Sequence, residues 1–264
     1  MIRRLIGTTV VVGAAAGAAA AAYALVARPR HLRWGATPEE VERAMPGDDY
    51  ILFPRVNATH AVTIAARAAD VWPWVAQMGR SRAGVFSYDW LGSTAGPESS
   101  GPGSTAPEQP VLNVGDEVAM MAGVASRVAE VDAPTRLVLT GTVDPRAGKV
   151  VDRTDPDVTT YLDSSWAFAL DERDAAEGFE TRLVARFRAD YTPQPGFHVA
   201  AKVFMEPALF AMDRKLLLGI KKHAEAGELP GPVPAPAAAG AVTAEVAEAP
   251  EAVSEAPAEA PPAS

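Results

Sequence analysis

The sequence predicts an α+β protein in which a curved antiparallel sheet wraps around a long C-terminal helix. Residues 182–191 alternate, with Leu183 and Phe187 on one face and Arg186 and Arg188 on the other. A period of two with one apolar face is typical of an antiparallel strand that is buried on one side and wet on the other. We therefore expect the arginine face of this strand to point into water.

The pattern becomes helical from residue 197 to residue 226. Its apolar side chains recur at steps of three or four residues: Leu209, Met212, Leu216 and Ile220. Charged residues are predicted to fill much of the remaining helix surface: Asp213, Arg214, Lys215, Lys221 and Lys222. This spacing is typical of a helix with one buried face, and we expect Pro207 to kink it or divide it in two.

Shorter elements precede that strand and helix. Residues 37–40 read as a capping box, in which Thr37 and Glu40 satisfy the first backbone N–H groups of a short helix. Further strands are predicted at 56–64, 117–121, 125–131, 136–143 and 165–170, a short helix at 69–78, and loops or polar connections at 92–110 and 144–163. The sheet offers the only large apolar face against which the C-terminal helix can pack, and a curved sheet often leaves a cavity there.

Composition excludes several classes of site. The 264-residue chain has a formal net charge of −9 and no cysteine. Its charge gives no electrostatic footprint for nucleic acid, and without cysteine it has no disulfide, thiolate nucleophile or cysteine metal site. The four histidines lack metal-ligand spacing, and no glycine-rich nucleotide motif occurs. We therefore predict neither a metal nor another cofactor.

The N-terminus predicts a membrane or export segment. Residues 5–27 form an uncharged run of 23 residues behind Arg3 and Arg4. As a helix it is long enough to cross a hydrocarbon core of about 30 Å. Its length favours a single-pass anchor in the cell membrane, while Ala22-Tyr23-Ala24 fits a signal cleavage site and leaves export open. Arginines flank both ends, so the positive-inside rule does not settle the orientation.

Three regions follow from these patterns. Residues 1–30 are the anchor or signal segment, and residues 31–229 form the folded domain. Residues 230–264 are dominated by proline, alanine and glutamate and contain no aromatic residue. Such a tail buries too little apolar surface to fold, so we expect it to be disordered.

The richest candidate site lies between residues 70 and 91, where three tryptophans alternate with charged residues. Asp89 is a candidate to orient or deprotonate a ligand hydroxyl, with Tyr88 as a donor and Arg82 as a carboxylate partner. The competing interpretation is a structural Arg–Asp pair beside a hydrogen-bonded tyrosine. The sequence does not separate the two.

The expected cavity has a set of candidate lining residues. Its ligand-binding candidates are Trp74, Gln77, Tyr88, Asp89, Trp166, Phe168, Met212 and Leu216. Core packing is the competing interpretation for the aromatic and methionine side chains. His60 falls on the apolar face of its strand and is a further candidate for cavity lining.

The element order and several motifs resemble the SRPBCC, polyketide cyclase/dehydrase-like family of the START-type, helix-grip superfamily. The motifs are RWGAT (33–37), VWPWVAQMG (71–79), FSYDWL (86–91), VGDEV (114–118) and EPALFAMDRKLLLGIK (206–221). The resemblance covers about residues 32–227 and implies a deep hydrophobic cavity for lipids, sterols, polyketides or similar ligands. It carries over no catalytic constellation, and the glycine-rich segment 92–103 departs from the family pattern.

Three functions remain open at this point. The first is a membrane-tethered protein that binds or carries a hydrophobic small molecule in the cavity. The second is a cyclase, dehydratase or hydrolase that uses Tyr88 and Asp89 on a hydrophobic substrate. The third is an interaction module with a vestigial cavity, in which the acidic tail or the anchor recruits a partner; no particular protein partner is predicted.

Overall fold

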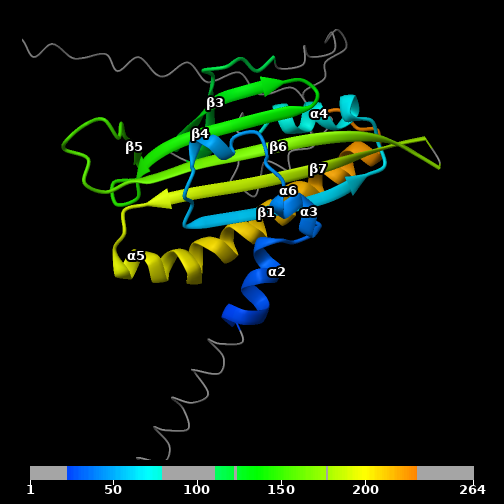
Figure 1. The fold of residues 1–264 in the computed structure, drawn as a ribbon. Helices are drawn as coiled ribbons and strands as arrows, with labels where there is room; N and C mark the ends of the chain where they lie inside the picture. The colour runs from blue at the N-terminus through cyan, green and yellow to red at the C-terminus, as the bar shows by residue number, and fades with distance from the viewer. Residues whose placement is uncertain (1–22, 79–110, 122–123, 177, 231–264) are drawn as a thin grey trace, which may run out of the picture. The chain divides into compact units, whose positions relative to one another are not determined.

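The computed structural model describes residues 23–78, 111–121, 124–176 and 178–230, and these contain a seven-stranded antiparallel sheet (Figure 1). The strands are β1 (Val56–Ile64), β2 (Glu117–Met121), β3 (Val124–Asp132), β4 (Arg136–Asp144), β5 (Lys149–Val150), β6 (Leu162–Ala175) and β7 (Gly178–Tyr191). Their order is β1-β7-β6-β4-β3-β2, with β5 paired to β4. The predicted α+β class with an antiparallel sheet is confirmed.

Helical segments precede, interrupt and follow the sheet. They are η1 (Tyr23–Ala27), α2 (Arg28–Leu32), α3 (Pro38–Glu42), η2 (Asp48–Tyr50), α4 (Ala68–Ala76), α5 (Pro195–Ala200), η4 (Ala201–Met205) and α6 (Glu206–Glu225). Every predicted strand is present, and the predicted connection 144–163 also contains the short strand β5. Within the described residues, no helix is long and apolar enough to cross a membrane. Most of the predicted anchor (residues 1–22) and of the tail (231–264) lies outside them.

The long C-terminal helix is confirmed, and the backbone keeps a helical conformation past Pro207. Met205 and Glu206 have φ/ψ values of −68°/−48° and −61°/−47°. The segment η4, which ends at Met205, is a turn of π-helix. A proline within a helix lacks one N–H and clashes with the carbonyl four residues earlier, and a wider π turn is a known way to relieve that conflict. Pro207 thus divides the helix by a change of helix type rather than by a break.

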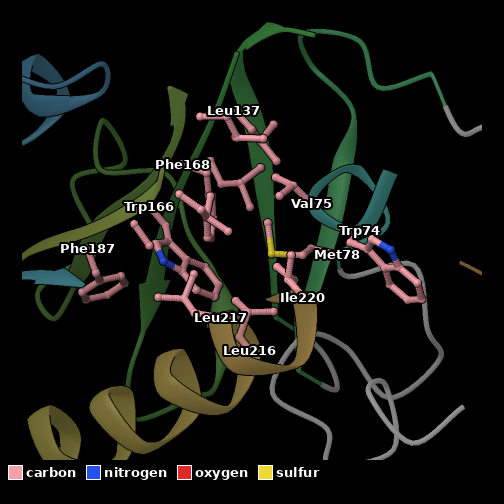
Figure 2. Close-up of a cluster of buried hydrophobic side chains, with 14 of the residues drawn as sticks. Trp74, Val75, Met78, Leu137, Trp166, Phe168, Phe187, Leu216, Leu217 and Ile220 are labelled. Carbon is pink, nitrogen blue, oxygen red and sulfur yellow. The ribbon is translucent and has the colours of Figure 1, made fainter. Parts of the chain in front are cut away.

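One face of the sheet packs against α6 and α4 (Figure 2). The contact is made by large apolar side chains, among them Leu137, Trp166, Phe168, Leu217 and Ile220, and these five are almost completely buried. Together with their neighbours they form one hydrophobic cluster that joins strand, short helix and long helix. This cluster is the main core of the domain.

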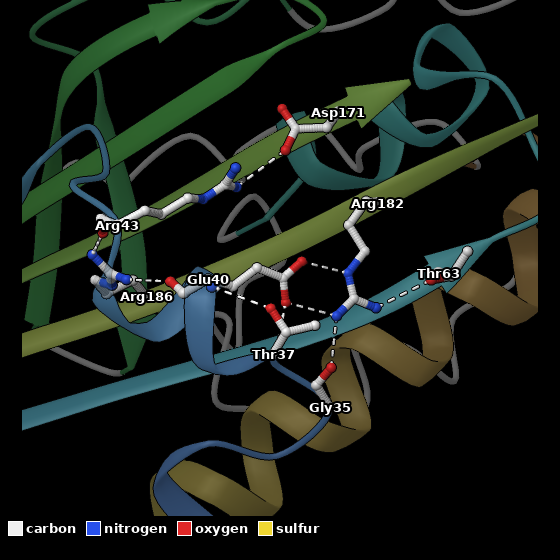
Figure 3. Close-up of polar contacts among 8 residues, drawn as sticks. All are labelled: Gly35, Thr37, Glu40, Arg43, Thr63, Asp171, Arg182 and Arg186. Carbon is white, nitrogen blue, oxygen red and sulfur yellow. Dashed lines mark hydrogen bonds and ion pairs between the residues drawn. The ribbon is translucent and has the colours of Figure 1, made fainter. Parts of the chain in front are cut away.

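The opposite face of β7 differs from the prediction, because its arginines do not all point into water. Arg186 is only 3 % exposed. The chain between residues 35 and 50, which includes α3 and η2, covers this face (Figure 3). An alternating pattern identifies the apolar face of a strand, but it does not reveal that a distant segment supplies carboxylates and carbonyls to the charged face.

The Arg186 guanidinium is fully occupied by this covering segment and by β1. It donates to the hydroxyl of Thr59, the carboxylate of Asp48 and the backbone carbonyls of Glu40, Val41 and Arg43, at distances of 2.6–3.1 Å. The three carbonyls lie at the end of α3, where a helix has acceptors without partners of its own. Burial lowers the pKa of Arg186 from its usual value, and the paired Asp48 compensates the buried charge.

Arg182, which lies four residues before Arg186 on β7, binds the same covering segment. Its Nε and Nη2 atoms donate to the two carboxylate oxygens of Glu40, both at 2.8 Å, and Nη2 also reaches the carbonyl of Gly35 at 2.6 Å (Figure 3). Glu40 in turn accepts from the backbone N–H of Thr37, whose hydroxyl accepts from the N–H of Glu40. The predicted capping box is confirmed, and its glutamate also serves as an anchor for the sheet.

We expect Arg186→Met to lower the free energy of unfolding by roughly 3–5 kcal/mol, because it removes the donor of three backbone carbonyls and of Thr59 and leaves Asp48 with Arg188 alone as its ion partner. Urea unfolding followed by circular dichroism measures the change. The exposed Arg173 on β6 supplies a matched control, since Arg173→Met is expected to change stability by no more than about 0.5 kcal/mol. Equal effects of the two variants would contradict a structural role for Arg186.

The Glu40 contacts also predict a pH dependence. Hydrogen bonds from Arg182 hold the pKa of Glu40 below its ordinary value of 4.5. A lowered pKa means that the ionised carboxylate stabilises the folded chain above that ordinary value, and that this stability is lost as the pH falls through the lower folded value. Glu40→Gln should therefore be less stable than the native chain at pH 7, and the difference should shrink below pH 4.5. Glu42→Gln, an exposed change on the same helix, should show no such convergence in urea titrations.

Candidate functional site

The interior between the sheet and α6 brings together most of the described ligand-binding candidates. Trp166 and Phe168 lie on β6 with ring centroids 4.9 Å apart. Leu216 of α6 and Trp74 of α4 belong to the same hydrophobic cluster (Figure 2). Met212 packs against this cluster while remaining partly exposed. The five side chains are thus collected around one apolar interior. Their contact with a ligand stays a prediction.

Trp74 closes this interior at the end of α6. Its ring stacks on that of His223, with centroids 4.8 Å apart, and its indole N–H donates to the carbonyl of Glu228 at 3.2 Å. The carboxylate of Glu228 also accepts from His223 at 2.6 Å. The short helix α4 is therefore fastened to the C-terminal end of the long helix, and Trp74 is the residue that joins them.

Gln77 occupies the C-cap of α4, where its backbone N–H donates to the carbonyl of Pro73. The next residue, Met78, is buried in the main core. The polar candidates Arg82, Tyr88 and Asp89 follow in the segment 79–110, which lies outside the described residues. Their predicted acid–base and positioning roles therefore stay predictions.

Methionine side chains border the apolar interior on several sides. Met78 and Met120 are buried in the cluster, whereas Met205 and Met212 pack against it from the helical segment and stay partly exposed. Methionine is flexible and polarisable, so it adapts to differently shaped apolar surfaces. These residues give the interior an adaptable boundary on both the sheet side and the helix side.

A buried polar pair interrupts this apolar setting. His60 of β1 and Asp213 of α6 are both completely buried. The His60 Nδ1 atom lies 2.7 Å from Asp213 Oδ2, and its Nε2 atom lies 2.7 Å from the backbone carbonyl oxygen of His31. The pair consequently joins the sheet, the long helix and the segment that precedes α3.

The carbonyl partner determines how protons are distributed in this pair. A carbonyl oxygen only accepts hydrogen bonds, so Nε2 of His60 must carry a proton. The contact between Nδ1 and Asp213 then contains one further proton, which belongs either to the imidazole or to the carboxyl group. In both cases the pair as a whole is neutral, which is the least costly state for two buried ionisable groups.

Asp213 corrects a prediction, because we expected it on the charged surface of the helix. Burial raises the pKa of its carboxyl group, and His60 opposes that shift. A signal for its burial was present, since Asp213 lies four residues after Leu209 and three before Leu216, within the apolar stripe of α6. Its charge led us to predict an exposed side chain, whereas its position in the helical repeat indicates the buried face of α6. His60, suggested as a cavity-lining residue, instead has both ring nitrogens occupied by protein partners.

A hollow of about 670 Å³ lies at β3 and β4, near η2 and β5. Its lining is mixed and includes Tyr50, Arg127, Thr140, Arg153 and Asp163. Arg153 spans this region, pairing with Asp163 and lying 4.1 Å from the ring centre of Tyr161. None of the predicted site residues that the structure describes lines this hollow. Elsewhere in the described part of the chain, no group of three or more histidine or acidic side chains is placed to hold a metal ion.

Comparison with known proteins identifies no family. No family model and no curated protein match the chain. Among solved structures, a hypothetical protein from Helicobacter pylori aligns with a TM-score of 0.41 and 12 % identity, covering 69 % of this chain and 95 % of its own. A protein from Arthrobacter aurescens gives 0.33 and 13 %, covering 69 % and 92 %. CalU16 from Micromonospora echinospora gives 0.28 and 15 %, covering 64 % and 84 %. These TM-scores are below 0.5, so the functional interpretation rests on the geometry described above.

The buried pair predicts a strong energetic coupling. We expect His60→Leu and Asp213→Leu each to cost roughly 3–5 kcal/mol of unfolding free energy, because each leaves one buried polar partner alone. The double variant should cost less than the sum by about 1–3 kcal/mol, although the carbonyl of His31 loses its donor in it. Urea unfolding of the four proteins measures the coupling. Additive losses would show that the two side chains do not stabilise one another.

Proposed function

We propose that this protein binds or carries a hydrophobic small molecule, lipid-like or polyketide-like, between its sheet and its C-terminal helix. The observation that supports this most is the apolar interior bounded by Trp74, Trp166, Phe168, Met212 and Leu216. The resemblance to the SRPBCC, polyketide cyclase/dehydrase-like family points to the same place.

The energetic basis of binding would be the transfer of an apolar ligand out of water. Each Å² of apolar surface removed from water contributes about 25 cal/mol, and a few polar groups then suffice to orient the ligand. Met205 and Met212 pack on the interior while remaining partly exposed. They are therefore suited to reshape the boundary as a ligand enters from the helix side.

We also propose that residues 5–27 tether the binding domain to the cell membrane as a single-pass segment, with export after cleavage as the alternative. The support is the uncharged run itself and the arginines that border it. A tether holds the binding domain close to the bilayer, where an apolar ligand is concentrated. The effective concentration of the ligand at the binding domain is therefore higher than in bulk water.

Native mass spectrometry of the full chain, followed by organic extraction, tests the binding proposal directly. A stoichiometric apolar molecule in the extract is the expected result. A chain that is empty and that also fails to enhance the fluorescence of 1-anilinonaphthalene-8-sulfonate would contradict it.

A pair of variants locates the site. We expect Met212→Trp to fill the helix side of the interior and to weaken binding of the same fluorescent probe by about tenfold or more, equivalent to roughly 1.4 kcal/mol. Lys222→Trp adds the same side chain to an exposed position on the same helix and should leave the affinity unchanged. Equal affinities of the two variants would place the probe elsewhere.

A further inference from the structure

Residues 23–32, where the predicted membrane-spanning run ends, contact η4 and the N-terminal end of α6. Arg28 donates through Nε and Nη2 to the two carboxylate oxygens of Glu206 at 2.6 and 2.8 Å, and Glu206 is almost completely buried. The hydroxyl of Tyr23 donates to the carbonyl of Lys202 at 3.0 Å. These contacts fix η1 and α2 beside η4, so the point where the run joins the domain has a defined position.

Exposed apolar side chains gather on the two segments that these contacts join. Val199 and Val203 lie four residues apart on α5 and η4, and Phe204 beside them is 72 % exposed. On η1, Leu25 is 77 % exposed and Val26 is also exposed. Isolated exposed apolar residues are ordinary, whereas a group of them on adjoining segments marks an interaction surface. We refer to these five residues as the η1–η4 surface.

The charges around the η1–η4 surface have one sign. Arg30 on α2 and Arg33 at its C-terminal end are exposed, and Lys202 lies on η4. No acidic residue occurs between residues 23 and 38 or between 191 and 205, and Glu206 is occupied by Arg28. Basic side chains around an exposed apolar surface match the headgroups and the acyl boundary of an anionic phospholipid bilayer.

We infer that the η1–η4 surface rests on an anionic phospholipid bilayer. The uncharged run 5–27 ends within this surface at Leu25 and Val26, which makes the surface continuous with the segment proposed to enter the membrane. The N-terminal end of α6 then faces the lipid, together with Met205, which packs on the apolar interior. The inference rests on the proposed tether but not on the proposed ligand binding.

The absence of cysteine makes a direct test possible in the full chain. Phe204→Cys and Leu229→Cys each introduce one thiol at an exposed apolar position, on opposite ends of α6. The 20 residues of α6 separate these positions by about 30 Å at roughly 1.5 Å per residue. Each variant is labelled with an environment-sensitive NBD fluorophore and reconstituted into vesicles of phosphatidylcholine and phosphatidylglycerol, with and without a nitroxide-bearing lipid.

We expect the label at position 204 to shift its emission to the blue in vesicles and to be quenched several-fold more by the nitroxide lipid than the label at position 229. Equal quenching at the two positions, in chains that float with the vesicles, would overturn the surface assignment while leaving the tether intact. A chain that does not float would overturn both the tether and the surface. A blue shift that appears without vesicles as the protein concentration rises would assign the surface to a second copy of the chain. The comparison of Met212→Trp with Lys222→Trp tests the interior separately.

Discussion

The fold depends on burying both faces of one strand. The apolar face of β7 packs in the main core with α6, while the opposite face buries the guanidinium of Arg186. A guanidinium has five N–H groups, and each buried N–H group without a hydrogen-bond acceptor lowers the stability of the folded state. Thr59 of β1 accepts from one of these groups, and the covering segment, with Asp48 and the last carbonyls of α3, supplies the acceptors for the others. The N-terminal segment is therefore a structural layer of the domain, and it occupies a face that the strand pattern assigned to water.

The same requirement explains the position of the second polar cluster. His60 needs a carbonyl and a carboxylate, and it obtains them from His31 and Asp213. These partners come from two segments far apart in the chain, so the pair forms only when sheet, helix and N-terminal segment are all in place. Apolar packing alone would hold α6 against the sheet, whereas the pair specifies which residues of the helix meet which residues of β1.

Local signals were sufficient for most of the fold. The alternation of 182–191 and the three- and four-residue spacing of α6 identified strand and helix, and the capping box at Thr37 and Glu40 identified a helix start. What the sequence did not indicate was long-range pairing, because the partners of Arg186 and Asp213 are more than a hundred residues away. The candidate site was predictable only in part, for a similar reason. Trp166 and Phe168 look the same in a sequence whether they pack a core or border a ligand.

The pairing of β1 with β7 has a consequence for how the chain is made. These strands pair along the whole of β1, from Val56↔Ala189 to Ile64↔Thr181. During synthesis, β1 can form these hydrogen bonds only after more than a hundred further residues have been added. Contacts of such high sequence separation form slowly, because the loop between them must close first. Throughout that interval neither edge of β1 is paired with its partner in the sheet, and nascent chains with unpaired edges are prone to aggregate. The nine residues of β1 should therefore need protection in the nascent chain until β7 has been synthesised and pairs with them.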